Sequence, residues 1–362
     1  MASIIRRATK KGYSYYVIYR HEGKQIWQYA GTKRHLAEKL KAKIEHEINT
    51  GIYEPVKDIT FKELADKWLN LRINTRPKHY KSTKAHIVRF NAVFGHKEVK
   101  RITQEDLETF IISLQSQGTL SPASISRTIM ILKSIFRKGI EWGYLSRNPA
   151  EAIKKPRVPK PNIEILEPSE IKKLIEATDE KHRCFIMFAA LTGCRLSEVL
   201  ALRWSDIDFA SSRVFIRQTL QSGKFYEPKT NLSKRVIDIP PALVKELKIH
   251  QARLAVELPQ NPYDLVFPTS VGTPREERNT VRRIFDVALK RAGLRKVGFH
   301  SLRHSYASQL IHQGEDILTV QRLLGHASAK TTLDRYGHLF EGKTKSAVAK
   351  LEESILKEDI LQ

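Results

Sequence analysis

Residues 300–336 contain the side chains best suited to chemistry at a phosphate. His300 and Arg303 stand three positions apart in HSLRHSYASQL, a stretch with helical residues and apolar spacing, so both lie on one helix face. A guanidinium beside an imidazole offers a phosphate a bidentate donor and a proton carrier. His326 and Tyr336 follow in LLGHASAKTTLDRYGH, and Tyr336 is a candidate nucleophile. Taken singly, Tyr336 could be a core aromatic residue and His326 a helix cap.

A second guanidinium has a carboxylate at the spacing that would hold it. In TGCRLSEVLALRW, Gly193 ends one helix and Arg195 stands in the first turn of the next, with Glu198 three residues on. At this spacing Glu198 orders the Arg195 side chain before a phosphate arrives. The alternative is an ordinary surface ion pair, which contributes little.

Lys229 supplies a mobile ammonium group. It lies in EPKTNLSKRVIDIP, whose polar run separates two strand-like runs and is therefore a hairpin tip. A lysine on such a tip can reach into a groove, although most hairpin lysines are simply solvated. Nothing local distinguishes Lys229 from Lys224 or Lys234.

Two further patterns in the C-terminal half have weaker chemical readings. His304 stands four residues after His300, the spacing of a zinc-binding helix, but Ser301 occupies the place of a metalloprotease base and no third ligand is evident. We therefore expect neither a metal nor a cofactor. Residues 337–344, GHLFEGKT, satisfy the phosphate-loop pattern but follow a short polar run, so we interpret them as a chance match.

The elements that position these residues divide the chain into parts. With 362 residues and 41% hydrophobic content it is long enough for two or three domains. The predicted fold is multidomain and mainly α with small β, with a mixed α+β part that carries the candidate site. The expected parts are a β-sheet plus helix at 1–55, four helices at 58–155, a proline-rich basic linker at 156–164, the mixed part at 165–345 and an amphipathic helix at 346–362.

The charge of the chain favours a polyanionic partner. There are 63 Lys and Arg residues against 39 Asp and Glu residues, a net charge of +24. A basic sheet with exposed aromatic residues suits a DNA groove, whereas the alternative is a sheet whose Tyr and Trp only cover its helix. Single basic residues on helices are usually solvated. The candidate DNA contacts are Arg6, Arg7, Lys10, Lys11, Arg20, Lys81, Lys84, Arg127, Lys133 and Arg137.

Other features weigh against membrane and secreted proteins. No apolar run approaches the roughly 20 residues of a spanning helix, and the N-terminus lacks the apolar core of a signal peptide. Cys184 and Cys194 flank an apolar run, which indicates buried, reduced thiols. The expected location is the cytoplasm, in association with the nucleoid.

The order of the motifs resembles one family. TGCRLSEVLAL, the hairpin lysine, HSLRHSYAS and LLGHASAKTTLDRY are similar to the tyrosine recombinases, the integrases of phages and integrative elements. The likeness covers residues from about 165 to 340. It implies a catalytic domain there, while residues 1–55 and 58–155 resemble the family's arm-type and core-binding DNA-binding domains.

The resemblance also implies the reaction. Arg195 and Arg303 would clamp the scissile phosphate and offset the charge of the pentavalent transition state. Tyr336 would attack phosphorus, become joined to the 3′ phosphate and release a 5′ hydroxyl. Since the phosphotyrosine keeps the energy of the broken bond, religation would need neither ATP nor metal.

The remaining candidates receive supporting roles by the same resemblance. His300 would accept the tyrosine proton, and Lys229 would protonate the departing 5′ oxygen. His326 would donate a hydrogen bond to the phosphate, and Glu198 would support the first arginine.

The resemblance implies an assembly as well. Four protomers would hold two DNA duplexes through core and arm sites and exchange strands in two rounds. The C-terminal helix would dock on a neighbouring protomer, although a terminal helix more often packs on its own domain. Whether a DNA-bending protein and an excision directionality factor take part stays open, as does whether Tyr336 acts in its own site or a neighbour's.

Two other functions compete with a recombinase. A type IB topoisomerase shares this chemistry but acts alone on one duplex, and would need neither the N-terminal sheet nor the tail helix. A non-catalytic DNA-binding regulator would need the basic surface but not Arg195, Arg303 and Tyr336 together.

Overall fold

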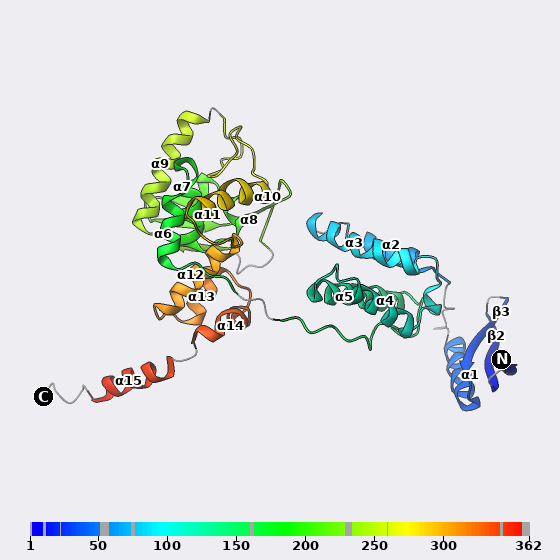
Figure 1. Ribbon diagram of the computed structural model, residues 1–362. Coiled ribbons are helices and arrows are strands. Elements are labelled where there is room, and N and C mark those ends of the chain that lie inside the picture. The colour runs from blue at the N-terminus through cyan, green and yellow to red at the C-terminus, as the bar shows by residue number, and fades with distance from the viewer. Residues whose placement is uncertain are drawn as a thin grey trace. The chain divides into compact units, whose positions relative to one another are not determined.

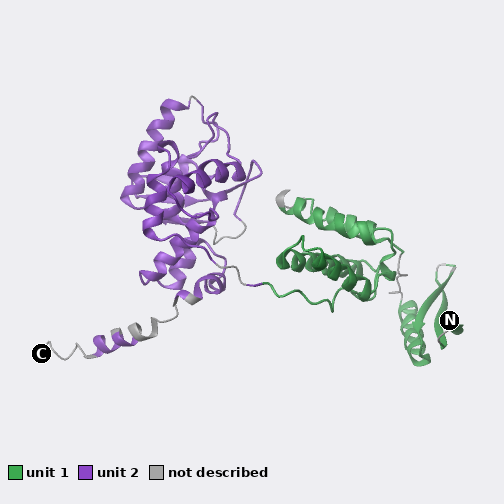
Figure 2. Ribbon diagram, viewed as in Figure 1, with its two compact units in different colours: residues 1–75, 79–158 green, residues 76–78, 159–362 purple. Residues whose placement is uncertain are grey.

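Over its described residues the fold is largely helical, with three small antiparallel sheets, which confirms the predicted fold class (Figure 1). The chain forms two compact units, residues 1–75 with 79–158 and residues 76–78 with 159–362 (Figure 2). Within the described part of the chain, no helix is both long and apolar enough to cross a bilayer. This computed structural model describes residues 2–9, 12–21, 23–50, 58–73, 77–159, 163–228, 234–258, 260–340 and 343–356.

The sheet part (residues 2–50) is a three-stranded antiparallel sheet with one helix. Its elements are β1 (Ser3–Thr9), β2 (Gly12–His21), β3 (Lys24–Gly31) and α1 (Arg34–Asn49). Ala37 and Ile44 of α1 pack against Val17 and Tyr19 of β2. Because side chains alternate along a strand, the intervening residues of β2 and their cross-strand partners lie on the other face.

The four-helix part (residues 58–153) has side-chain N-caps at helix starts. Its elements are α2 (Phe61–Asn70), α3 (Pro77–Phe94), the 3-10 turn η1 (Val99–Arg101), α4 (Gln104–Ser116) and α5 (Pro122–Glu141). Thr60 and Glu63 form a capping box at α2, and Thr103 caps α4. The helices enclose a core that includes the rings of Phe61, Phe90, Phe94, Phe110 and Phe136.

The α/β part (residues 163–340) is built around the apolar helix α7. Its first elements are α6 (Pro168–Glu176), α7 (Glu180–Thr192), α8 (Leu196–Val199), η2 (Trp204–Asp206), β4 (Ile207–Asp208), β5 (Arg213–Ile216), β6 (Thr219–Gln221), β7 (Lys224–Tyr226), β8 (Arg235–Asp238) and α9 (Pro241–Glu257). Strands β4, β5 and β8 form one sheet, and β6 pairs with β7. Phe185, Ile186 and Phe188 of α7 are buried in the main core.

The remaining elements of the α/β part complete the main core and, from α12 onward, form a second, smaller core. The elements are α10 (Glu277–Thr280), the π-helical turn η4 (Val281–Phe285), α11 (Asp286–Arg291), α12 (His300–His312), α13 (Ile317–Leu324), α14 (Ala329–Tyr336) and η5 (Gly337–Phe340), and α15 (Lys343–Leu356) follows. Ile311, Val320, Leu324 and Tyr336 pack together in this core. Helix α14, not a strand, precedes Gly337, which favours the chance-match interpretation of the phosphate-loop pattern.

Candidate active site

Arg303 is buried at the centre of the site. It lies in the first turn of α12 and is only 2% exposed. Its Nη1 donates to the Gly193 carbonyl at 2.8 Å, and its Nη2 donates to the Leu324 carbonyl at 2.6 Å. These carbonyls stand at the C-terminal ends of α7 and α13, whose partial negative charge favours a cation. Burial, then repulsion from Arg195, lowers the pKa of Arg303 to about 9, so it stays cationic at neutral pH.

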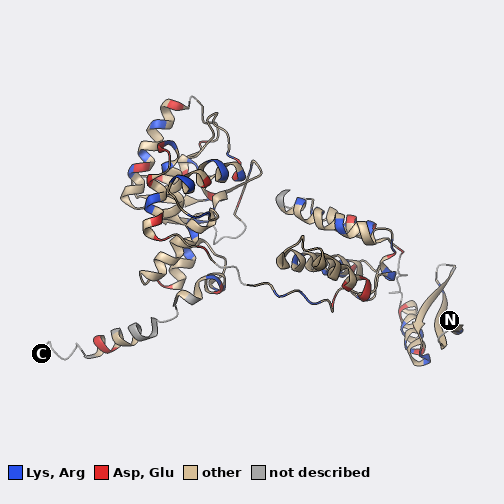
Figure 3. Cartoon of the chain, in the orientation of Figure 1, with Lys and Arg blue, Asp and Glu red and all other residues tan. Residues whose placement is uncertain are grey.

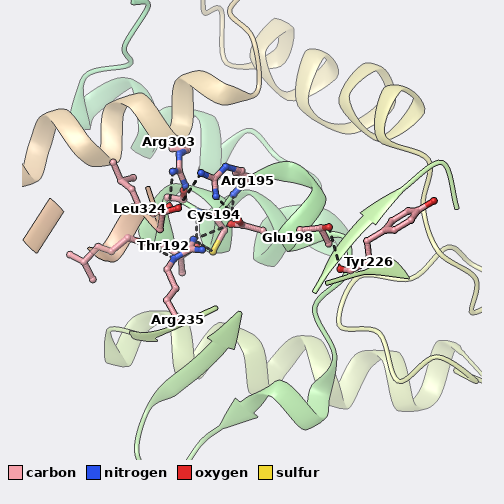
Figure 4. A network of polar contacts seen from close by, with 12 residues as sticks. Thr192, Cys194, Arg195, Glu198, Tyr226, Arg235, Arg303 and Leu324 are labelled. Carbon is pink, nitrogen blue, oxygen red and sulfur yellow. Dashed lines mark hydrogen bonds and ion pairs between the residues drawn. The ribbon is translucent and has the colours of Figure 1, made fainter. Parts of the chain in front are cut away.

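Glu198 holds two further guanidiniums. Arg195, the N-cap of α8, donates from Nη1 to Glu198 Oε1 at 2.7 Å, and its backbone N–H donates to Oε2 at 2.9 Å. Arg235 of β8 donates from Nη2 to Glu198 Oε2 at 3.0 Å and from Nε to the Leu323 carbonyl at 2.8 Å. Figure 4 shows the three arginines gathered in this network. The pair that the sequence predicts is therefore present, and its carboxylate is buried.

The charges of this network favour an anionic ligand. Three guanidiniums and one carboxylate leave a formal charge of +2. Burial acts to raise the pKa of Glu198, but Arg235 and then Arg195 outweigh it and bring that pKa to about 2, so the carboxylate is ionised. The Arg195 side chain is 34% exposed, against 6% for Arg235. Arg195 is thus the guanidinium that a ligand reaches from solvent.

Two glycines allow the backbone to pass close to these side chains. Gly193 ends α7 with φ 59°, and a Cβ there would lie 2.4 Å from the Tyr306 ring. Gly325 ends α13 with φ 63°, and a Cβ there would lie 2.8 Å from Arg235. The Gly325 carbonyl also accepts a hydrogen bond from Arg195 Nη2 at 3.3 Å. The left-handed turns therefore present both carbonyls to the arginines.

His326 is fixed immediately after the second of these turns. It is 5% exposed, and its Nδ1 lies 2.9 Å from the Thr332 hydroxyl. Burial, followed by the charges of Arg303 and Arg195, lowers the pKa of His326 to about 3, so the imidazole is neutral. With the Thr332 hydroxyl donating, the ring proton is on Nε2, which can donate to a ligand.

Tyr336 is the last residue of α14 and is 1% exposed. Its hydroxyl lies 2.6 Å from Nδ1 of His304, one helix turn beyond His300. His300 is exposed, and its ring contacts the His304 ring edge-on with centroids 4.7 Å apart. Burial raises the pKa of Tyr336, while Arg303 and Arg335 partly oppose this. The sequence led us to expect His300 beside the tyrosine hydroxyl, but the structure places His304 there.

Three of the predicted residues, Lys229, Lys10 and Lys11, lie outside the described residues. Of the remaining candidate DNA contacts, Lys81 and Lys84 lie on α3, and Arg127 and Arg137 on α5, all exposed. Lys133 is half-buried, and its Nζ donates to the Glu151 carbonyl at 2.7 Å, so part of its hydrogen-bonding capacity is used within the four-helix part.

Sequence reasoning missed the positions of Arg235 and His304. Period-two alternation in RVID places Arg235 on the same face of β8 as the buried Ile237, which marks an inward-pointing charge. His304 follows Arg303 directly on a helix, and we considered it only as a zinc ligand. Among the described residues, no group of three or more His, Cys, Asp or Glu side chains is arranged to hold a metal ion.

Comparison with known proteins places both the four-helix part and the α/β part of the chain in one family. Residues 164–343 match the phage integrase family, and residues 60–155 match the phage integrase SAM-like domain. The ICEBs1 integrase of Bacillus subtilis (strain 168) is 31% identical over 337 residues, which covers 90% of this chain and 91% of that protein. A tyrosine recombinase of Thermosipho africanus is 32% identical over 281 residues, covering 75% of this chain and 92% of that protein.

Solved structures share the fold. The integrase of the Tn1549 transposon in complex with transposon right end DNA has a TM-score of 0.70 at 20% identity, covering 82% of this chain and 99% of that chain. A lambda integrase dimer bound to a COC′ core site has a TM-score of 0.61 at 20% identity, covering 92% and 95%. The matches over both domains and nine tenths of the sequence show that the chain belongs to the tyrosine recombinases of the phage integrase family, site-specific enzymes that cleave and rejoin DNA.

Proposed function

We propose that this recombinase integrates or excises a mobile element and that Tyr336 is the nucleophile that cuts each strand. The observation that carries the proposal is the meeting of Arg195 and Arg303, from distant parts of the sequence, at the carbonyls that end α7 and α13. The same helix that carries Arg303 also contacts the Tyr336 hydroxyl through His304. A phosphodiester between the two arginines would offset the net positive charge of the network.

The chemistry follows from these positions. The arginines bind the non-bridging oxygens, where negative charge grows as phosphorus becomes pentavalent. The Tyr336 oxygen attacks phosphorus, the bond to the 5′ oxygen breaks, and a 3′-phosphotyrosine forms. We assign His326 to a hydrogen bond with the phosphate, and Lys229 to protonation of the leaving 5′ oxygen. Reversal of these steps with a new 5′ hydroxyl rejoins the DNA.

A nicked suicide duplex that carries the attachment site tests this assignment. Loss of a short fragment past the nick prevents religation, so the wild-type protein should accumulate a covalent protein–DNA adduct without ATP or metal. Tyr336→Phe should bind the duplex and form none. An adduct that persists in Tyr336→Phe would exclude Tyr336 as the nucleophile, and no adduct with the wild type would favour a non-catalytic regulator.

A topoisomerase-like enzyme is separated by its products. Mixing two marked duplexes that both carry the site should give recombinant products if strands are exchanged. Relaxation of a supercoiled plasmid without any exchange would favour the type IB topoisomerase alternative. We favour exchange because the chain aligns with an integrase and a tyrosine recombinase over nine tenths of its length.

We also propose that the sheet part binds arm sites in the DNA. Trp27 and Tyr29 are 43% and 55% exposed, and they do not belong to the core beneath α1. The Arg7 guanidinium lies 4.6 Å from the Trp27 ring centroid, which supports a basic and aromatic face. By strand alternation Arg20 shares that face, whereas Arg6 lies over Tyr13 on the opposite side. Arg7→Ala should weaken arm-site binding and lower its salt dependence more than Arg6→Ala does.

The four-helix and α/β parts are proposed to grip the core site. Figure 3 shows that Lys and Arg are spread over both units rather than confined to one. Such a distribution suits a long duplex contact, and it agrees with a location on the nucleoid. Replacing the exposed Lys81, Lys84, Arg127 and Arg137 with Gln should weaken core-site binding. Replacing four basic residues of α1, where we expect no core-site contact, is the matched control.

The C-terminal helix α15 is proposed to dock on a neighbouring protomer in a tetramer. Val348, Leu351 and Ile355 form an apolar stripe and are 64%, 58% and 61% exposed. Deleting residues after 345 should abolish tetramers on DNA while leaving the thermal stability of the monomer intact. A collapse in thermal stability would instead show that α15 packs on its own domain. Gel shifts with added candidate factors would reveal a DNA-bending protein or an excision directionality factor.

A further inference from the structure

We propose that His304, rather than His300, takes the proton from the Tyr336 hydroxyl during strand cleavage. This inference rests on the proposed role of Tyr336 as nucleophile. It adds a second histidine of α12 to the reacting groups and gives the His300 ring a supporting position beside it. The proposal rests on two contacts of the His304 imidazole, one with the Tyr336 hydroxyl and one with the His300 ring.

The His304 ring contacts both the nucleophile and a second ring. Its Nδ1 is 2.6 Å from the Tyr336 oxygen, and the two ring centroids are 5.7 Å apart. The His300 ring stands at 89° to the His304 ring, with their centroids 4.7 Å apart. Among the described residues, His304 is the side chain that hydrogen-bonds to the tyrosine hydroxyl. A general base must lie within about 2.6–3.2 Å of the atom whose proton it removes, and His304 meets this condition before DNA binds.

The protonation state suits an acceptor. Burial, then the charges of Arg335 and Arg303, lowers the pKa of His304 to about 4, so the resting imidazole is neutral and Nδ1 can accept. As the Tyr336 oxygen bonds to phosphorus and the bond from phosphorus to the 5′ oxygen breaks, the phenolic proton moves to Nδ1. The 5′ oxygen takes its proton from the separate acid assigned to Lys229. In religation the His304 imidazolium returns its proton to Tyr336.

Binding of DNA would strengthen this base. The phosphate brings a negative charge close to Arg303, which with Arg335 lowers the pKa of His304. Partial neutralisation of the Arg303 charge raises that pKa, so the imidazole becomes a better acceptor only when substrate is present. The competing interpretation is that the bond between His304 and Tyr336 is a lock that holds the tyrosine inactive.

Single-turnover cleavage of the nicked suicide duplex distinguishes these interpretations. His304→Asn keeps a polar atom near the position of Nδ1 but cannot take up a proton. A general base contributes about 10²–10⁴-fold, so His304→Asn should cleave at least about 100-fold more slowly at pH 7, with partial recovery as pH rises. His312→Asn, on the same helix and exposed, should cleave at the wild-type rate. His300→Asn should be slowed less and keep the wild-type pH profile.

Two measurements separate a lost base from a lost fold or a lost acid. Added imidazole should restore cleavage to His304→Ala, which a merely structural role would not allow. A duplex with sulfur at the 5′ bridging position needs no acid for its leaving group, and His304→Asn should stay slow on it. Cleavage by His304→Asn within threefold of the wild type, or faster, would overturn the proposal. If Tyr336 is not the nucleophile, Tyr336→Phe would still form the adduct, so failure of that role is distinguished from failure of the role of His304.

Discussion

Replacement of Arg235 by Met should destabilise the α/β part strongly, although Arg235 was not among the residues the motifs single out. Arg235 and Glu198 are 6% and 2% exposed and joined at 3.0 Å. Met fills a similar volume, so the main change is the loss of one positive charge beside a buried carboxylate. Removal of one partner of a buried pair leaves the other charge poorly compensated.

Two routes give a similar magnitude. Breaking a buried ion pair costs about 3–5 kcal/mol, and the lower end applies because Glu198 keeps Arg195. The pKa of Glu198 falls from 4.5 to about 2 as the net effect of burial, which raises it, and of Arg235 and Arg195, which lower it. This shift corresponds to roughly 3 kcal/mol at about 1.4 kcal/mol per pKa unit and sets the scale for both arginines together. A carboxyl with a lowered folded pKa contributes its stability above about pH 4.5 and loses it as pH falls towards 2. The cost of Arg235→Met should therefore be roughly 3 kcal/mol at pH 7 and smaller at pH 3.

Urea titration of the full chain measures the free-energy cost of Arg235→Met. Pulsed hydrogen exchange of peptides from β5 and α12 reports that cost for the α/β part. Arg213→Met is the matched control, because Arg213 pairs with Asp238 on the same sheet but the two side chains are 55% and 83% exposed. That control should cost less than about 1 kcal/mol. The double variant Arg235→Met with Glu198→Gln should recover part of the loss. Equal costs for the two arginines would refute the reasoning.

Three further outcomes follow from the same contacts. Gly193→Ala should destabilise the α/β part by more than about 1 kcal/mol in urea titrations and lower cleavage, because its Cβ would meet the Tyr306 ring and move a carbonyl that Arg303 uses. Thr332→Val should lower cleavage at unchanged DNA affinity, since it removes the hydroxyl that sets the His326 tautomer, and ¹⁵N NMR of the imidazole reports that tautomer. His304 and His326 have folded pKa values of about 4 and about 3, below the unfolded value of 6.5. The unfolded chain therefore binds more protons between these values and 6.5, so the free energy of unfolding should fall as pH drops through this window. The fall should be smaller in a variant with both residues changed to Asn.

Most of the fold could be predicted because local signals and tertiary packing agree. Thr60 with Glu63 marks the start of α2 through the chemistry of a capping box, and runs rich in Tyr, Val, Ile and Trp mark β2 and β3. Short elements carried less information. Helix α8 has only four residues, and a periodic pattern cannot be read over so short a span, so its bounds came from the structure.

The site shows where sequence reasoning stops. Arg195 and Glu198 could be paired from spacing because helix geometry fixes neighbours three residues apart. The contact between His304 and Tyr336 joins residues 32 apart through the turn between α13 and α14, and no local period encodes it. His300 and His304 both follow from the α12 pattern, and which of them meets the tyrosine depends on how α14 packs against that helix. A motif alone therefore does not decide which of the two histidines accepts the proton, because the choice depends on tertiary geometry. The proposal predicts a changed pH profile for His304→Asn and the wild-type profile for His300→Asn.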